Sequence, residues 1–175
     1  MYPFVRLVYQ TALSAGQPKL GPFETHVSHH ICWPWDIDMF MEMNNGRVLT
    51  VFDLGRFPLA QRAGLLGAIR RNGWTLSMLG ASVRYRRRIL PFRRYQMRSR
   101  ALGFDARFMY LEQSIWRGED CCASVLYRSA ALHKGKMVPT REVEAALNLT
   151  EASPELPAWV QAWIEADATR PWPPD

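Results

Sequence analysis

The sequence has no long apolar run, and its number of cysteines is odd. Much of its middle also contains no acidic residue. No stretch approaches the roughly 20 apolar residues that a membrane-spanning helix needs. The N-terminus has no charged segment followed by a long apolar one, so we expect neither a transmembrane segment nor a cleaved signal peptide. The cysteines Cys32, Cys121 and Cys122 make no disulfide framework. These absences predict a cytoplasmic protein in a reducing compartment.

The region without acidic residues runs from Asp53 to Asp105 and is rich in arginine, in a chain of net charge +6. A basic region favours an anionic partner, such as a phosphorylated small molecule, a nucleic acid or an anionic membrane surface. A solvated cationic face is the alternative. The arginine cluster consists of Arg84, Arg86, Arg87, Arg88, Arg93, Arg94, Arg98 and Arg100.

The chain has 175 residues, 48% of them hydrophobic, which predicts one domain with a sizeable core. Hydrophobic periodicity predicts helices at 1–16, from about 45 to 60, at 140–147 and at 158–166, and strands at 25–33, 75–88, 94–102, 108–116 and 121–133. Pro58 is expected to kink or end the long helix.

The element order is one strand, a long helix and then a run of antiparallel strands. This order predicts an α+β fold of the hotdog type, with a curved antiparallel sheet wrapped around a central helix. We divide the chain into an N-terminal helix and linker (1–22), the hotdog domain (23–149) and a C-terminal helix with a Pro/Trp tail (150–175). A small sheet has exposed edges that commonly pair across a dimer, so we expect a homodimer or a higher homo-oligomer.

The segment that indicates chemistry is WPWDIDMFMEMNNGRVLTVFDLGR, residues 33–56. It places Asp36 and Asp38 in a loop before an Asn-Asn-Gly turn that opens a helix. Free N–H groups and the dipole at a helix N-terminus favour negative charge or a polarised carbonyl oxygen. The sequence therefore predicts a loop carboxylate beside a helix N-terminus.

This segment resembles the hotdog acyl thioesterases, including the 4-hydroxybenzoyl-CoA and acyl-ACP thioesterase branches. The resemblance rests on Asp36-Ile37-Asp38, Asn44-Asn45, Asp53 and Arg56, and the later Val83-Arg84-Tyr85-Arg86-Arg87 is similar to the arginine-containing strand of that family. Cys32-Trp33-Pro34-Trp35-Asp36 and the terminal Arg170-Pro171-Trp172-Pro173-Pro174 resemble the THEM-type thioesterase-like proteins.

The resemblance implies that Asp38, the second Asp, is the catalytic carboxylate, either as nucleophile or as general base for water. Backbone N–H groups near Asn45 and Gly46 would stabilise the oxyanion. The resemblance implies no cofactor, and Arg84 or Arg86 would contact the phosphates of coenzyme A. An acidic carrier-protein surface would also match the arginine cluster.

The chain departs from the acyl-ACP thioesterase pattern, which has Asn two residues and His four residues after the catalytic Asp. Phe40 and Glu42 stand at these positions. Glu42 is a candidate base in place of the histidine, or an exposed loop residue. Phe40 and Met43 line an acyl pocket or pack around the helix start. Asp53 is catalytic, as in some hotdog branches, or pairs with Arg56 three residues on.

We therefore predict a thioesterase that acts on acyl-CoA or a related acyl thioester. The missing histidine keeps open a non-catalytic hotdog protein that binds acyl-CoA or lipid. A nucleic-acid-binding module rests on the arginine cluster alone and is disfavoured. Adjacent His29 and His30 fall on opposite strand faces, so no metal site is expected.

Residues 1–16 carry an apolar helical stripe. We expect it to dock on the body of the protein or on a partner subunit rather than on a membrane. The stripe consists of Phe4, Val5, Val8, Tyr9 and Ala12.

Overall fold

The computed structural model describes residues 2–171 and 173–174, so Trp172 of the terminal motif lies outside the described residues. Its centre is a six-stranded antiparallel sheet with the strand order β1-β3-β4-β5-β2, to which β6 adds through β5. The strands are β1 (His26–Ile31), β2 (Thr75–Tyr85), β3 (Arg94–Phe104), β4 (Met109–Arg117), β5 (Asp120–His133) and β6 (Lys136–Met137). Each expected strand is present, with ends that differ by up to three residues.

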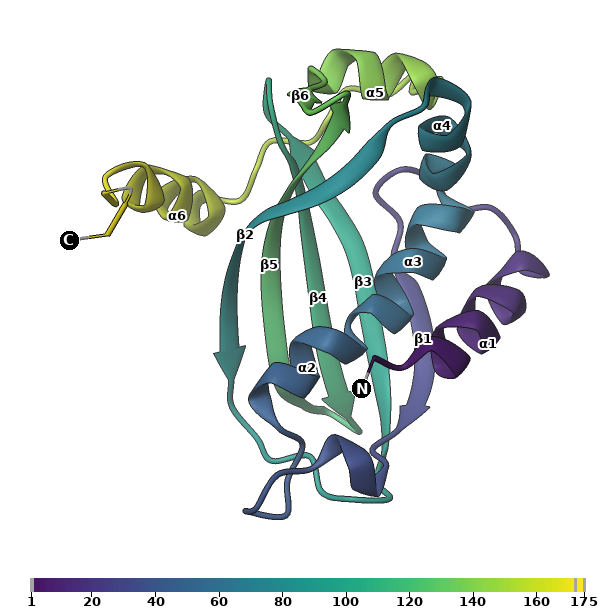
Figure 1. Ribbon diagram of the computed structural model, residues 1–175, viewed down its shortest axis with the longest axis vertical. Coiled ribbons are helices and arrows are strands. Elements are labelled where there is room, and N and C mark those ends of the chain that lie inside the picture. The colour runs from purple at the N-terminus through teal and green to yellow at the C-terminus, as the bar shows by residue number, and fades with distance from the viewer. Residues whose placement is uncertain (1, 172, 175) are drawn as a thin grey trace.

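Helices cover both faces of this curved sheet (Figure 1). They are α1 (Phe4–Ala15), α2 (Asn45–Val51), α3 (Asp53–Arg62), α4 (Leu65–Asn72), α5 (Thr140–Ala146) and α6 (Ala158–Ala168), with a short 3-10 helix η1 (Pro34–Asp36). The helix pair α2–α3 runs along the concave face, α1 lies beside α3 near β1, and α6 lies on the opposite side of the sheet. The α+β hotdog architecture predicted from the element order is confirmed.

The main core forms where α2 and α3 pack against the concave face of the sheet. Phe52 and Leu54 are fully buried there against Met97 and Ile115. The helix approaches so closely at Gly55 that an added Cβ would lie 2.6 Å from Met97 Sδ. Because this distance is below any ordinary contact, a larger residue at position 55 would force the buried Met97 and Ser99 side chains to shift where α3 crosses β3.

The long central helix is interrupted at Phe52 and continues through Pro58 to Arg62. The expectation that Pro58 could end this helix is therefore wrong. At the interruption, the Phe52 carbonyl oxygen accepts the N–H groups of Gly55 and Arg56 over 3.1 and 3.0 Å. The buried Gln113 side chain of β4 also donates to this oxygen over 2.8 Å, which ties the junction of α2 and α3 to the sheet.

A smaller core on the convex face holds α6 against the sheet. Val160 of α6 is fully buried and packs with Tyr110 and Leu126. Arg128 of β5 also donates to Asp167 of α6 over 2.7 Å. No helix in the described part of the chain is long and apolar enough to cross a membrane.

Candidate active site

The loop between β1 and α2 folds back on itself as a short hairpin. Ile37 and Met43 form a β-bridge, and the Asp38 N–H donates to the Glu42 carbonyl oxygen over 2.9 Å. Met41 has a left-handed backbone, φ 57°, which is uncommon for a residue other than glycine. The exposed tip consists of Met39, Phe40 and Met41. The chain thus holds Asp38 at the base of a hairpin whose apolar tip reaches solvent.

Asp36 is a buried structural hub with 1% of its surface exposed. Its Oδ2 accepts hydrogen bonds from Arg6 Nη1 over 2.7 Å and from the Trp33 N–H over 3.1 Å. Its Oδ1 accepts from Arg47 Nε over 2.6 Å. Two guanidinium groups and a backbone donor therefore occupy this carboxylate, which leaves it a structural role.

Asp38 has a different environment from Asp36 although only one residue separates them. Its Oδ1 accepts the Phe40 N–H over 2.9 Å, which fixes the side chain against its own loop. Within residues 2–171 and 173–174, no cation pairs with this carboxylate and its Oδ2 has no hydrogen-bond donor. Asp38 is half-buried, so it keeps one carboxylate oxygen available for chemistry.

The N-terminus of α2 offers two backbone donors. Asn44 is the N-cap, and its Oδ1 accepts the Arg47 N–H over 3.1 Å, while its carbonyl oxygen accepts the Val48 N–H over 2.9 Å. The N–H groups of Asn45 and Gly46 have no acceptor among the residues that the structure describes. Unused N–H groups at a helix start favour an anionic oxygen.

A hollow of about 170 Å³ lies directly beside this helix start. Tyr85, the last residue of β2, borders the hollow and donates its hydroxyl to the Asn45 carbonyl oxygen over 3.1 Å. Of the predicted site residues, the hollow is lined by Glu42, Met43, Asn45 and Arg86. Asp38 and Phe40 belong to the adjoining hairpin but do not line the hollow.

Glu42 forms an ion pair with Arg88 from the loop after β2. Arg88 also donates to the Phe40 carbonyl oxygen over 2.6 Å, so a single guanidinium group ties both positions at which the chain departs from the acyl-ACP thioesterase pattern. Met43 is 4% exposed and belongs to the main core, whereas the Phe40 side chain is 67% exposed. Met43 therefore packs around the helix start, which is one of the two alternatives predicted for it.

Asp53 lies in a separate cluster on α3. It pairs with Arg56, as the spacing predicts, and accepts the Tyr2 hydroxyl over 2.7 Å. Burial, together with the bond to Asp53, raises the pKa of Tyr2 to about 12. Arg56 lies over the Tyr127 ring, 4.7 Å from its centre. These contacts engage Asp53 away from Asp38.

Arg84 lies on the other side of the sheet from this helix start. It stands opposite Ser124 in the β2–β5 ladder, and directly opposed residues share a face. Along β5 that face carries Leu126 and Arg128, which contact α6. Of the two predicted phosphate contacts, only Arg86 is therefore near Asn45.

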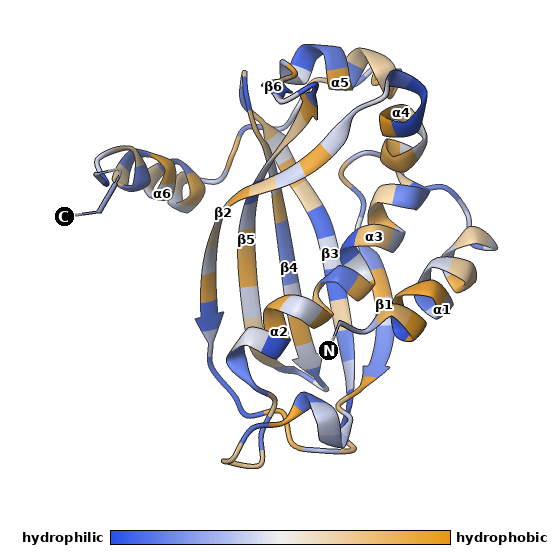
Figure 2. Ribbon diagram, in the orientation of Figure 1, coloured by the Kyte–Doolittle hydropathy of each residue, from blue (hydrophilic) through white to orange (hydrophobic). Residues whose placement is uncertain are grey.

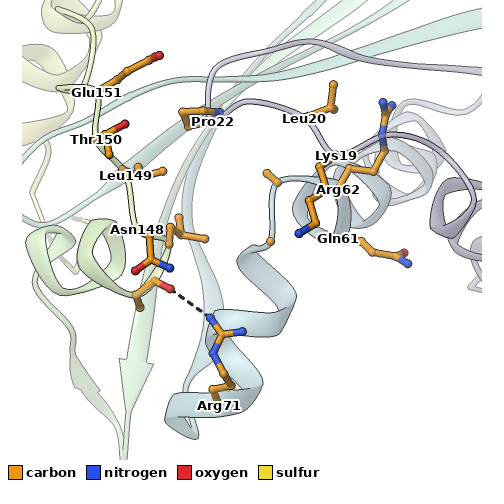
Figure 3. A pocket seen from close by; sticks show the side chains of 14 residues that line it. Lys19, Leu20, Pro22, Gln61, Arg62, Arg71, Asn148, Leu149, Thr150 and Glu151 are labelled. Atoms are coloured by element: carbon orange, nitrogen blue, oxygen red, sulfur yellow. Dashed lines mark hydrogen bonds between the residues drawn. The ribbon is translucent and has the colours of Figure 1, made fainter.

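A larger hollow, of about 450 Å³, lies at the far end of α3 (Figure 3). Lys19, Arg62 and Arg71 contribute three cations to its lining, and Arg71 donates to the Ala146 carbonyl oxygen over 3.2 Å. It contains none of the residues that the sequence singled out. Size alone therefore does not locate the site that the motif indicates.

Sequence reasoning missed the residues that organise the loop. Arg6 reaches Asp36 across 30 positions and Arg88 reaches Glu42 across 46, so no local spacing signals either pair. Tyr85 stood within the quoted arginine-containing strand, but its bond to Asn45 spans 40 positions. The one signal for this contact in the sequence was the position of Tyr85, whose aromatic hydroxyl stands at the end of a strand that approaches the helix start.

The fold and this loop geometry agree with comparisons to known proteins. A sequence profile of the thioesterase-like superfamily matches residues 32–164, which include the hairpin, the central helix and every strand of the sheet except β1. The chain belongs to this superfamily. The predicted family membership is thereby confirmed, and the superfamily is one of thioester hydrolases.

Two curated relatives are similar over most of the chain. Protein THEM6 of Xenopus laevis is 31% identical over 140 residues, covering 80% of this chain and 67% of the relative. Protein THEM6 of Drosophila melanogaster is 29% identical over 169 residues, covering 93% of this chain and 84% of the relative. The resemblance to THEM-type proteins is confirmed.

Solved structures of other proteins have the same fold. The probable thioesterase YbaW of Escherichia coli has a TM-score of 0.65 at 15% identity, with 69% of this chain and 95% of that chain covered. The 1,4-dihydroxy-2-naphthoyl-CoA thioesterase Slr0204 of Synechocystis has a TM-score of 0.59 at 16% identity, with 73% and 98% covered. At these identities the similarity establishes the fold alone.

Proposed function

We propose that this superfamily member hydrolyses acyl-CoA or a related acyl thioester, with Asp38 as the catalytic carboxylate. The observation that carries the proposal is the contrast within the loop. Asp36 is consumed by Arg6 and Arg47, whereas Asp38 keeps an oxygen without a donor in the described chain. The N–H groups of Asn45 and Gly46 remain available near the same loop for the oxyanion.

The chemistry needs a carboxylate, an oxyanion site and a thiolate leaving group. In the general-base route, Asp38 removes a proton from water, whose oxygen adds to the thioester carbonyl carbon. The oxyanion accepts hydrogen bonds from the N–H groups of Asn45 and Gly46, and a missing donor of this type costs about 10²–10³ in rate. The carbon–sulfur bond then breaks, and the products are the carboxylic acid and the thiol.

In the nucleophilic route, Asp38 itself attacks the carbonyl carbon and expels the thiolate. Water then hydrolyses the resulting mixed anhydride. A single turnover in ¹⁸O-water can reveal the nucleophilic route, because label enters the Asp38 carboxylate when water attacks the anhydride at Asp38. Label in the product acid alone arises from direct attack by water and equally from attack of water on the acyl carbon of the anhydride, so trapping of the anhydride with hydroxylamine separates those two cases.

Glu42 forms an ion pair with Arg88, so we rank it second to Asp38 as the catalytic base. A carboxylate held by a guanidinium group is less available as a base than Asp38 is. Arg86 lines the hollow at the helix start and suits a phosphate of coenzyme A. We therefore assign Arg86, rather than Arg84, to the phosphate contact.

We also propose that the protein is a homodimer that pairs through β2. This strand is an edge of the sheet, with β5 on its only bonded side in the described chain. Its exposed apolar side chains are Leu76, Met78 and Leu79, each about 40% exposed. An exposed apolar edge strand favours pairing with a second copy. Light scattering during size-exclusion chromatography tests this, and a monomeric mass contradicts it.

Thiol release from a panel of acyl-CoAs tests the activity, with wild type compared with Asp38→Asn. We expect turnover on at least one acyl-CoA and a loss of at least about 10³-fold in the variant. Glu42→Gln is the matched control and should retain most activity. Full activity in Asp38→Asn would remove Asp38 from the mechanism. Saturable acyl-CoA binding without thiol release on any chain length would favour the non-catalytic binding protein.

A further inference from the structure

Helix α1 has its larger apolar side turned outward, while Leu7 and polar side chains such as Arg6 and Ser14 face the protein. The outward residues form one contiguous half of the helix, which we call the α1 apolar face. It consists of Phe4 (67% exposed), Val5 (84%), Val8 (68%), Tyr9 (60%) and Leu13 (48%), with Ala12 between them. Of the two alternatives expected for this stripe, this orientation contradicts docking on the body of the protein, and docking on a partner subunit stays a prediction.

Polar contacts hold α1 in this orientation. Arg6 donates to Asp36 over 2.7 Å and to the Ile31 carbonyl oxygen over 3.3 Å. Gln10 donates to the His29 carbonyl oxygen over 3.5 Å, and Ser14 is buried on the same side. The helix therefore caps the free edge of β1 with its polar side. Its exposed apolar face is a consequence of a fixed orientation.

A hollow of about 820 Å³ runs between α1 and the neighbouring strands β1 and β3. Val5 and Tyr9 of the α1 apolar face border one side of it, and Arg94 and Arg98 of β3 border the other. No carboxylate is among its described lining residues. Arg94 has no ion pair in the described chain, and Arg98 lies over the Trp116 ring, 4.4 Å from its centre. The hollow thus has an apolar wall and a cationic wall.

We propose that α1 and this hollow dock on an anionic phospholipid surface. The α1 apolar face lies in the boundary between headgroups and acyl chains, as interfacial helices do. Arg94 and Arg98 bind the headgroup phosphates beside it, because a guanidinium group matches phosphate geometry. Figure 2 shows α1 as an outlying helix with apolar segments at the side of the molecule, next to β1.

Two observations favour a lipid surface over a second copy of the chain. First, β1 and β2 are opposite edges of the sheet, so a dimer through β2 leaves α1 uncovered. Second, a symmetric pairing of two α1 apolar faces would bring the cationic walls of both copies together, and like charges oppose such an arrangement. Anionic headgroups neutralise the same arginines.

Flotation of the protein with vesicles tests the docking directly. Wild type should float with phosphatidylglycerol–phosphatidylcholine vesicles and not with phosphatidylcholine vesicles, and high salt should weaken the binding. The double variant Val5→Asp, Val8→Asp should lose at least about tenfold in partitioning. Arg94→Glu should also lose about tenfold.

Trp159→Asp on α6 is the matched control, because Trp159 is 50% exposed and far from α1 on the other side of the sheet. It should float like wild type. Circular dichroism and thermal melting establish that each variant is folded, and Arg94→Glu carries the test if the α1 double variant fails to fold.

Three results would overturn the proposal. Failure of wild type to bind anionic vesicles contradicts the proposed docking. A folded α1 double variant that floats like wild type removes the α1 apolar face from the interaction. A smaller oligomer for the double variant, without any vesicle binding by wild type, makes the face an interface between copies. Hydrolysis of soluble acyl-CoA should survive Val5→Asp, Val8→Asp, so this test is independent of the proposed activity.

Discussion

The Tyr85 hydroxyl donates a hydrogen bond to the Asn45 carbonyl oxygen over 3.1 Å and thereby ties the end of β2 to the first turn of α2. Asn45 is one of the two residues whose N–H groups are assigned to the oxyanion. Tyr85 therefore holds one of the proposed oxyanion residues from outside the loop that carries Asp38. The same hydrogen bond connects α2 to β2, the edge strand through which we propose that two copies pair.

Removal of this hydroxyl should lower activity more than stability. For Tyr85→Phe we expect kcat to fall roughly three- to tenfold, because a net hydrogen bond is worth about 0.5–1.5 kcal/mol. The melting temperature should change little, since the side chain is 43% exposed. Tyr9→Phe removes an exposed hydroxyl with no partner in the described chain and serves as the control. Equal kinetics for both variants would exclude a positioning role for Tyr85.

Asp36→Asn should destabilise the fold strongly. The substitution removes the buried carboxylate charge that pairs with both Arg6 and Arg47, and a broken buried pair costs about 3–5 kcal/mol. Urea unfolding measures the change. Asp38→Asn is the comparison one residue away, and we expect it to cost less than about 1 kcal/mol. A similar loss in both variants would contradict the division between a structural and a chemical carboxylate.

Gly46→Ala should separate stability from activity. An added Cβ would lie 3.3 Å from Asn44 Oδ1, so the cap and the neighbouring N–H groups must shift. We expect thioester hydrolysis to fall about tenfold to a hundredfold, because oxyanion donors act only in a narrow geometry. Alanine favours helix over glycine, so the melting temperature should hold or rise. Gly67→Ala in α4, where the nearest atom belongs to the flexible Arg71 side chain, should leave activity unchanged.

Stability should fall as the pH drops below the ordinary histidine range. Burial, with the Arg6 charge as a second cause, lowers the pKa of His30 to about 3, and burial next to Arg62 lowers the pKa of His26 to about 4. Between about pH 6.5 and pH 4 the unfolded chain binds protons that the folded chain does not. Each histidine then lowers the free energy of unfolding by about 1.4 kcal/mol for each pH unit of acidification.

Urea unfolding across this pH window measures the slope. His30→Gln should reduce the slope by about 1.4 kcal/mol per pH unit, because one linked proton is gone. The exposed His29 faces the opposite side of β1, so His29→Gln should leave the slope unchanged. An unaltered slope in His30→Gln would mean that His30 is protonated in the folded protein.

The hotdog order of elements was predictable because periodicity is a local property. Alternation marked β2 to β5, and the interval between Asp38 and Asn45 marked the loop before the central helix. The hydrogen bond that ties the helix junction to the sheet was not predictable, since Gln113 lies 61 positions from Phe52. The sequence offered Pro58 as the obvious breaker, but α3 continues through Pro58 and the interruption falls at Phe52.

By itself the sequence determined the fold class, the family resemblance and the presence of two carboxylates before a capped helix. Only the tertiary structure decided that Asp36 is buried between Arg6 and Arg47 while Asp38 keeps a carboxylate oxygen without a donor in the described chain. Only the tertiary structure turned the apolar side of α1 outward. The physical reason is the same in both cases. Local spacing sets which residues share a face, whereas burial and charge pairing depend on partners that folding brings from distant parts of the chain.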